Sequence, residues 1–355
     1  MLKAIATITA GVVLSACAVP IGASRVATVR IDPIAAGWNA SALDALIDYV
    51  GSQKSTGLII IQNDKVIVAK QWPLPADADR FQTTFVHGTA SDGALLEDVA
   101  SLQKSFVAIL AGIAIDKRLL DLSQPVSLYI GTGWSKAMPD QEAVIRVRNL
   151  MEMNSGLKED LSIDVSPDSK FFYNTPAYAI MKSVLVAAAK QSLDEITQAW
   201  LAQPAGMHDT TWRKRPSQLA DAGNSSGLVT TPGDIARMGQ LVLHAGVTTD
   251  GVRVISQQQL DALFVRTKTN PSYGRLWWLN GGSETVGIGN DAPRRAGPFI
   301  PAAPVDMIAA MGALDRKLFV VPSRKLIVVR TGPAAPDPDV NEKLWRLLVR
   351  ALPAG

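Results

Sequence analysis

The sequence has very few cysteine and histidine residues and no cluster of like charges. Its 355 residues include one Cys and three His, and the 35 Lys and Arg residues nearly balance the 32 Asp and Glu residues. One Cys excludes an intrachain disulfide and a cysteine-based zinc cage, and three His argue against a histidine-rich metal site. Without a basic run, the sequence indicates no nucleic-acid partner. These absences favour chemistry that needs no metal and no other cofactor.

No apolar run is long enough for a membrane-spanning helix, although the chain is rich in apolar residues. Hydrophobic residues make up 47% of the sequence and charged residues 19%, a balance that predicts a folded chain with a large core. At roughly 150 residues per domain, the length fits two lobes, or one enzyme domain that carries an insertion.

The N-terminal segment has the pattern of an export signal. Lys3 precedes an apolar stretch from Ala4 to Val13, and small residues follow before Cys17, as in a cleavable signal peptide. About 13 mostly apolar residues at 1.5 Å per residue are too few to cross roughly 30 Å of hydrocarbon. We predict a signal peptide over residues 1–16 and a tether over residues 17–34.

Leu14 to Cys17 resembles the bacterial lipobox. The resemblance implies cleavage before Cys17 and attachment of diacylglycerol to its sulfur, so that the acyl chains anchor the mature protein to a membrane. Ala18, where an Asp could follow the Cys, resembles the pattern of sorting to the outer membrane. The expected location is the bacterial cell envelope, on the periplasmic face. An ordinary signal peptide with an incidental Cys is the alternative.

Both ends of the chain show the pattern of a β-hairpin together with an amphipathic helix. The predicted elements are a helix at 41–50 and strands at 57–62 and 65–69 near the start, and strands at 317–321 and 325–330 and a helix at 341–352 near the end. We infer an α/β protein of the α+β type, with one antiparallel sheet built from both termini and covered by those helices.

The middle of the chain is dominated by helical patterns and reads as an insertion into this sheet. We predict one domain over residues 35–355. Its sheet lobe is expected at about 35–95 and 264–355, and its mostly helical lobe at about 96–263.

Two short motifs match known functional patterns but lack the flanking structure that those patterns need. Gly223 to Gly227 matches G-x-S-x-G around Ser225, but no strand pattern precedes it and no helix directly follows it. Gly287 to Ala292 matches a dinucleotide fingerprint, but Pro293 follows where a helix should begin. We discard the dinucleotide motif and interpret the first motif as a flexible or substrate-lining loop. An α/β-hydrolase that uses Ser225 is a distant third alternative.

The pattern S-x-x-K occurs twice, at Ser101 and at Ser155. Ser155 follows a predicted helix, where carbonyl groups oppose an oxyanion, whereas Ser101 begins a nearly apolar helix whose free N–H groups point toward it. Lys104 lies on the same helix face as Ser101. An apolar setting near the positive helix end should lower the pKa of Lys104 and leave a neutral amine that takes the serine proton. From the pattern alone, a capped helix with a Lys that reaches solvent stays open.

The surroundings of Ser101 resemble the serine hydrolases related to class C β-lactamases and DD-peptidases. The resemblance covers about residues 43–352 and rests on five segments in order: Ala100 to Lys117, Leu120 to Tyr129, Arg146 to Leu157, Gly206 to Trp212 and Gly227 to Arg237. It implies a β-lactamase/transpeptidase-like fold, and it places Ser155 and Ser225 in stretches that are not nucleophilic.

The family's second motif, Y-x-N, allows two alignments. In relatives the motif Tyr precedes the next aromatic residue by five positions, as Tyr173 precedes Tyr178, which makes Tyr173 the catalytic phenol and puts Thr175 at the Asn position. The other alignment keeps Asn174 in register but leaves Phe172 at the Tyr position. We prefer the first, in which a phenolate favoured by the neighbouring lysine cation shuttles the proton, and Thr175 contacts the substrate.

The third motif, K-T-G or H-x-G, corresponds to Ala310, Met311 and Gly312, so its cation is missing. The resemblance implies that the N–H groups of Ser101 and Ala313 form an oxyanion hole, and that Met311 and Gly312 contact the substrate. In β-lactamases and DD-peptidases the Lys helps to bind the substrate carboxylate. Ala310 therefore favours small esters or amides over β-lactams. The motif resembles that of the branch related to carboxylesterases and 6-aminohexanoate-dimer hydrolase.

Trp277 and Trp278 are candidates for the wall of an acyl pocket. Adjacent residues of a strand point to opposite faces, so one of the two is expected in the core. Trp277 is taken as the substrate-binding candidate.

Together these residues predict acyl transfer through a covalent intermediate. Ser101 attacks a carbonyl group, Lys104 and Tyr173 move the proton, and water then releases the acid. The expected partners are a small ester or amide and a membrane, the latter through the lipid on Cys17. The missing cation and Asn leave a second interpretation open, in which a catalytically inactive lipoprotein keeps the fold as a binding or scaffold module.

Overall fold

A six-stranded antiparallel sheet joins the two ends of the chain in the computed structural model, which describes residues 29–289 and 292–353. The strands, in sheet order, are β2 (Lys65–Gln71), β1 (Gly57–Gln62), β12 (Leu326–Thr331), β11 (Arg316–Val321), β10 (Ile308–Gly312) and β7 (Trp278–Leu279). In the pairing of β1 with β12, Gly57 lies opposite Thr331 and Gln62 opposite Leu326. The predicted fold class, with a sheet built from both termini, is confirmed.

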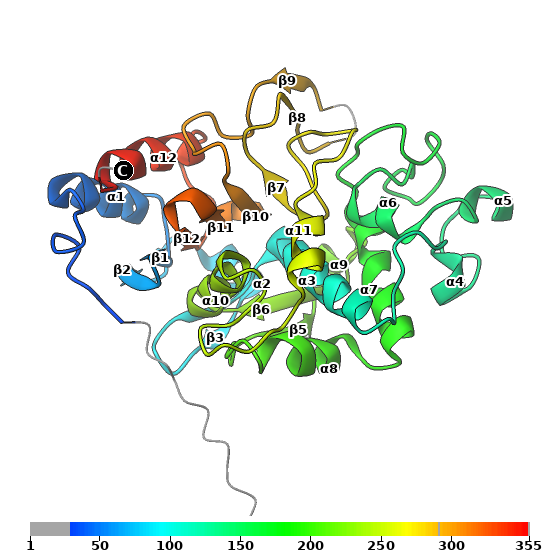
Figure 1. The fold of residues 1–355 in the computed structure, drawn as a ribbon, viewed down its shortest axis with the longest axis horizontal. Coiled ribbons are helices and arrows are strands. Elements are labelled where there is room, and N and C mark those ends of the chain that lie inside the picture. Colours follow the sequence, from blue (N-terminus) through cyan, green and yellow to red (C-terminus); the bar gives the residue numbers. More distant parts are fainter. Residues whose placement is uncertain (1–28, 290–291, 354–355) are drawn as a thin grey trace, which may run out of the picture.

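Helices cover both faces of this sheet. Trp345 of α12 (Val340–Ala351) packs against Phe319, whereas Gly239 of α10 (Pro232–Leu243) approaches the side chain of Leu318. Phe319 and Leu318 are neighbours on β11 and therefore point to opposite faces. The N-terminal helix α1 (Ala40–Ser52) lies beside α12, as Figure 1 shows at the left of the molecule.

A second sheet has four strands, in the order β3 (Val86–Thr89), β4 (Leu95–Asp98), β6 (Ser226–Thr230) and β5 (Thr211–Lys214). The structure thus differs from the predicted division into lobes. Strand β3 pairs with β4, and β4 pairs with β6, so neither belongs to the main sheet. Helix α10, from the predicted helical lobe, covers the main sheet. Strands of four or five residues carry too few alternations for a sequence to reveal their partners.

The first residues that the structure describes already belong to the fold. Arg30 forms a parallel bridge with Val66, and the N–H of Ile31 donates to the carbonyl of Val66 at 3.2 Å. The predicted tether boundary at residue 34 is therefore too late, because this short segment runs along the edge strand β2. The predicted signal peptide, Cys17 and residues 18–28 lie outside the described residues.

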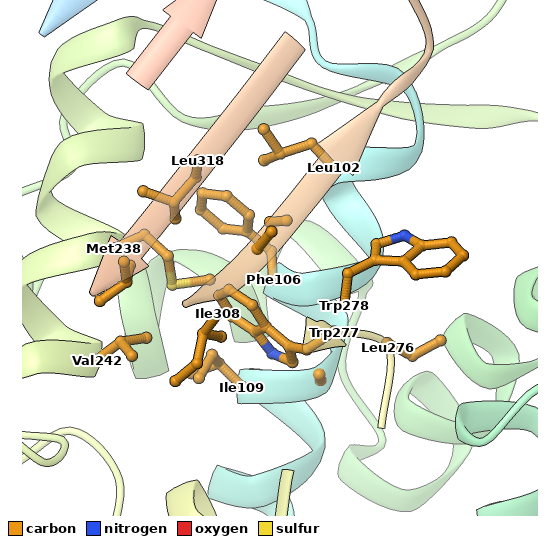
Figure 2. Close-up of a cluster of buried hydrophobic side chains, with 14 of the residues drawn as sticks. Leu102, Phe106, Ile109, Met238, Val242, Leu276, Trp277, Trp278, Ile308 and Leu318 are labelled. Carbon is orange, nitrogen blue, oxygen red and sulfur yellow. The ribbon is translucent and has the colours of Figure 1, made fainter. Parts of the chain in front are cut away.

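A buried helix, α3 (Gln103–Asp116), stands at the centre of the molecule. It follows a short 3-10 turn, η1 (Ala100–Leu102), and contacts α7 (Thr175–Ala189) and α11 (Gln257–Leu263). Figure 2 shows Leu102, Phe106 and Ile109 of this segment among side chains of α10, β10 and β11. Its apolar surface on all sides explains why it is enclosed.

The remaining elements are short. They are α2 (Asp79–Phe85), α4 (Ser127–Ile130), α5 (Pro139–Glu142), α6 (Val147–Met151), α8 (Leu193–Thr197), η2 (Gln198–Ala202), α9 (Ser217–Ala220), β8 (Glu284–Val286), β9 (Arg294–Ala296), η3 (Ala313–Asp315) and η4 (Pro322–Arg324). None of the helices within the described ranges combines the length and the hydropathy needed to cross a bilayer.

Candidate active site

Ser101 stands at the start of the central helix, directly after a residue with a strained backbone. Ala100 has a φ of +49°, a left-handed conformation that costs a non-glycine residue roughly 1–2 kcal/mol. Its N–H donates to Oδ1 of Asp98 at 2.8 Å, and the N–H of Leu102 donates to the carbonyl of Val99 at 3.1 Å. Such strain is concentrated at functional sites, where the surrounding contacts hold it in place.

Lys104 lies beside the Ser101 hydroxyl inside the protein. Its Nζ is 3.0 Å from Ser101 Oγ and 3.2 Å from Thr175 Oγ1, and the residue is 1% exposed. Burial lowers the pKa of Lys104 well below its ordinary value, and the nearby cations Arg215 and Lys182 lower it further. The neutral amine that results can accept the serine proton.

Tyr173 completes a cluster of three side chains. Its phenol is hydrogen-bonded to the Ser101 side chain, and Lys104 Nζ lies 4.8 Å from its ring centroid. Burial raises the pKa of Tyr173 to about 12, although the hydrogen bond to Ser101 opposes the rise. The expected phenolate is therefore not favoured, because burial outweighs the hydrogen bond that would lower the pKa of Tyr173. The phenol keeps its proton at neutral pH and can donate it.

The start of α7 supplies the third hydroxyl of the site and explains the role of Asn174. The Asn174 side chain caps the helix by accepting from the N–H of Ala177 at 3.0 Å, and it donates to the carbonyls of Leu157 at 2.8 Å and Lys158 at 2.9 Å. All of these bonds are structural. Thr175, the next residue, is the one that reaches Lys104.

The end of β10 passes very close to the turn that carries Ser101. A Cβ on Gly312 would lie 2.4 Å from the carbonyl oxygen of Val99, so only glycine allows this approach. The η3 turn that begins at Ala313 contacts the η1 turn that carries Ser101. Met311 is half-buried, whereas Ala310 is fully buried and brings no charge.

The structure corrects the choice between the two tryptophans. Trp277 is fully buried and packs against Phe264, and Figure 2 shows its ring in the apolar cluster close to Ile308. Trp278 points the other way and stacks on the Tyr173 ring with centroids 5.8 Å apart. The predicted candidate Trp277, which precedes the two-residue strand β7, is therefore a core residue, and Trp278, the first residue of β7, is the one that lies beside Tyr173.

Sequence reasoning missed a buried ion pair behind the site. Arg215 donates to both carboxylate oxygens of Asp98, each at 2.7 Å, and the side chains are 9% and 2% exposed. A Cβ on Gly227 would lie 1.9 Å from this carboxylate, which explains one glycine of the G-x-S-x-G pattern. No sequence signal pairs Arg215 with Asp98, since Asp98 ends β4 and Arg215 follows β5, more than a hundred positions later.

A second buried lysine was also missed. Lys182 lies one helical turn after Tyr178 on α7, and the Tyr178 ring has Lys104 Nζ at 4.7 Å and Lys182 Nζ at 5.7 Å from its centroid. A Lys within the apolar face of a predicted helix was the available signal.

Two further polar residues, Ser155 of the second S-x-x-K pattern and Asp160, have local partners. Ser155 is buried, and its Oγ accepts from the N–H of Leu157 at 3.4 Å. Asp160 pairs with Lys136 at 3.0 Å on the surface. Within residues 29–289 and 292–353, no group of three His, Cys, Asp or Glu side chains could hold a metal ion.

A cavity of about 750 Å³ lies beside the start of α7. Its lining includes Thr175, Pro176, Lys182, Asp221, Ser225 and Ser226. Thr175 belongs both to this lining and to the contacts of Lys104, whereas the lining does not include Ser101, Lys104 or Tyr173.

Comparisons with known proteins agree with this geometry. The profile of the Beta-lactamase family matches residues 43–284. A structure from Bacteroides dorei, assigned provisionally as a beta-lactamase, has a TM-score of 0.67 at 15% identity, covering 88% of this chain and 99% of its own. A Bacillus anthracis structure, assigned provisionally as a 6-aminohexanoate-dimer hydrolase, has a TM-score of 0.64 at 15% identity, with 86% and 80% covered. A Mycobacterium bovis beta-lactamase structure has a TM-score of 0.61 at 17% identity, with 88% and 100% covered. No curated protein matches the sequence significantly.

Proposed function

The chain belongs to the Beta-lactamase family, whose members are generally hydrolases, and from this premise we propose that it cleaves a small ester or amide through an acyl-enzyme on Ser101. The family gives the kind of reaction. The substrate and the roles of individual residues are the proposal.

The observation that carries the proposal is the contact between Lys104 and Ser101. Lys104 Nζ is 3.0 Å from Ser101 Oγ, and its buried position and cationic neighbours favour the neutral amine. A neutral amine within hydrogen-bond distance of a hydroxyl is a general base in position for a nucleophilic serine. A scaffold protein that had lost catalysis would gain nothing from keeping a lysine without its charge.

The reaction then proceeds in two halves. Ser101 Oγ bonds to the carbonyl carbon while its proton moves to Lys104 Nζ, and the N–H groups of Ser101 and Ala313 hold the oxyanion. The proton passes through the Tyr173 hydroxyl to the leaving oxygen or nitrogen as that bond breaks. Water attacks the ester in the second half, gives its proton to the same pair, and frees the acid and the Ser101 hydroxyl.

The substrate class follows from the end of β10. Ala310 is buried and uncharged, so this position offers no partner for the carboxylate that β-lactams and D-Ala-D-Ala peptides carry. Esters and amides that carry no such carboxylate do not need a cation at this position. The likeness to a structure provisionally assigned as a hydrolase of the 6-aminohexanoate dimer is consistent with an amide.

The decisive experiment is covalent labelling. The purified protein is treated with a fluorophosphonate probe, and the adduct is located by peptide mapping, for the wild type, Ser101→Ala and the control Ser155→Ala. We expect a fast adduct on Ser101 that is lost in Ser101→Ala and kept in Ser155→Ala, together with hydrolysis of short-chain esters. A folded wild-type protein without any Ser101 adduct would instead support the inactive binding module.

We further propose that the mature protein is lipid-anchored through Cys17 in the bacterial envelope, at the outer membrane and facing the periplasm. The lipobox-like residues Leu14 to Cys17 support this. Metabolic labelling with a palmitate analogue and membrane fractionation test it. Cys17→Ser should lose the label and appear in the soluble fraction, and a wild-type protein without lipid would contradict the proposal.

A further inference from the structure

A second serine and a second buried lysine meet at the cavity beside α7. Lys182 Nζ lies 2.8 Å from Ser226 Oγ and 3.0 Å from the carbonyl oxygen of the same residue, and it also donates to Oδ1 of Asn224. Lys182 is 7% exposed. Ser226 is half-buried and is the first residue of β6. The proposed reaction at Ser101 uses neither Lys182 nor Ser226.

The hydrogen-bond partners of Lys182 determine which role each of them takes when the amine is neutral. It has two N–H groups and one lone pair. The carbonyl oxygens of Asn224 and Ser226 can only accept, so they take the two N–H groups. The Ser226 hydroxyl is the one partner able to donate, and its proton therefore points at the lone pair of Lys182. In this state the serine is oriented toward a general base.

The surroundings favour that neutral state near physiological pH. The pKa of Lys182 is lowered to about 7, first by burial and then by the cation of Arg215, whereas the carboxylate of Asp98 opposes the shift. The faces of the Tyr178 and Trp212 rings lie 5.7 and 5.2 Å from Nζ.

The pair is open to small molecules. Both Lys182 and Ser226 line the cavity of about 750 Å³, a size within the range of small-ligand sites. Its wall also includes apolar side chains of α7, among them Ala179 and Ile180, which suit the carbon chain of an acyl group.

We propose that Ser226 is a second nucleophile, with Lys182 as its base, that accepts an acyl group from an activated neutral ester bound in this cavity. Ser226 Oγ bonds to the carbonyl carbon and its proton passes to Lys182 Nζ. The bond to the leaving alcohol breaks, and that alcohol takes the proton from Lys182. The product is an ester on Ser226 and a neutral Lys182. The same pair takes up a fluorophosphonate, with fluoride as the leaving group.

The test uses the Ser101→Ala background, so that the result does not depend on the proposed function. The full-length protein is labelled with the fluorophosphonate between pH 6 and 9, and rates and sites are followed by mass spectrometry. We expect one slower adduct on Ser226, formed at a rate that rises through about pH 7 as Lys182 loses its proton.

Three further substitutions in the Ser101→Ala background test the roles of the individual residues. Ser226→Ala should abolish the adduct, and Lys182→Met should slow it at least about tenfold, as removal of a general base does. The control Ser217→Ala, at an exposed serine of α9 outside the cavity lining, should leave it unchanged. Thermal unfolding shows which variants are folded. If Lys182→Met does not fold, the pH profile of the Ser101→Ala protein decides.

Two results would overturn the inference. One is a folded Ser101→Ala protein without an adduct on Ser226 at any pH in this range. The other is an adduct whose rate does not depend on pH or on Lys182, which would mean that the Lys182 contact only fastens the loop to α7. Failure of the proposed function shows separately, as a wild-type protein that is not labelled on Ser101.

Discussion

The guanidinium of Arg215 is joined to the carboxylate of Asp98 by two hydrogen bonds, from Nε to Oδ2 and from Nη2 to Oδ1, each 2.7 Å long. Asp98 Oδ1 also accepts from the N–H of Ala100, the strained residue before the candidate nucleophile. Arg215 in turn lowers the pKa values of Lys104 and Lys182. One buried ion pair therefore supports the turn that carries Ser101, and its arginine adds to the effect of burial in lowering the pKa of Lys104.

Arg215→Met is expected to destabilise the protein strongly. The substitution leaves the Asp98 carboxylate, which is 2% exposed, without its partner, and breaking a buried pair in this way costs about 3–5 kcal/mol. The measurement is the free energy of unfolding from urea denaturation. The matched control is Arg213→Met, an exposed residue on β5, which should change it by no more than about 0.5 kcal/mol. Equal losses in the two variants would show that the ion pair adds no stability.

The pH dependence of ester hydrolysis should report the charge of Lys104. Because burial and two cations depress its pKa, the amine is already neutral well below the ordinary range of lysine. The value of kcat/KM is then lost as the pH falls through that depressed pKa and Lys104 gains a proton. Arg215→Met removes one cation, so the pKa of Lys104 rises and the acidic limb moves to higher pH.

A substitution of Lys104 itself separates its charge from its basicity. Lys104→Arg keeps a cation that cannot lose its proton, and it should lower kcat by about 10²–10⁴-fold, as expected for a lost general base. Steady-state kinetics with a short-chain ester measure this. A variant with near-wild-type kcat would contradict the role of Lys104 as the base.

Tyr173→Phe tests the proposed proton donor through the leaving group. The phenol keeps its proton because burial raises its pKa to about 12, so its role is to protonate the leaving atom. An alkyl ester or an amide, whose leaving group is poor, should lose about 10²–10⁴-fold in kcat, and a nitrophenyl ester much less. The control is Tyr49→Phe, because Tyr49 lies on α1, which packs against α12 and contributes no residue to the site. An equal loss for both substrates would mean that Tyr173 only shapes the site.

Local patterns allowed the sequence to predict much of the site. Ser101 and Lys104 are three residues apart at the start of one helical segment, a spacing that brings their side chains to the same face. The spacing of Tyr173 from Tyr178 is also local, so both relationships can be recognised in the sequence. The hairpins at the two ends were visible for the same reason, since each strand carries enough residues to show its period.

Features that depend on tertiary contacts could not be predicted. The partner of Asp98 is Arg215, more than a hundred positions away, and nothing near either residue in the sequence announces the other. The choice of Trp277 over Trp278 depended on which strand face meets the core, and a two-residue strand gives no alternation from which to tell. The protonated state of Tyr173 depended on burial, which emerges only from the assembled fold.

The close approach of β10 to the nucleophile turn gives a last prediction, at Gly312. A Cβ there would lie 2.4 Å from the carbonyl oxygen of Val99 and 3.4 Å from Cβ of Leu102, so Gly312→Ala must push the strand away from the start of α3. We expect a loss of about 1–3 kcal/mol in the free energy of unfolding, as for other overpacked sites. We also expect a fall in kcat, because the Ala313 N–H moves with the strand and no longer faces the oxyanion.

The control for this substitution is Gly287→Ala, where a Cβ would meet only Ala292, at an ordinary 3.6 Å. Urea denaturation and ester kinetics are measured on both variants. A fall in kcat that persists in Gly312→Ala under conditions where the protein is fully folded separates the loss of the oxyanion hole from the loss of stability. If Gly312→Ala keeps its kcat while losing stability, the N–H of Ala313 does not hold the oxyanion, and the second donor must come from elsewhere in the site.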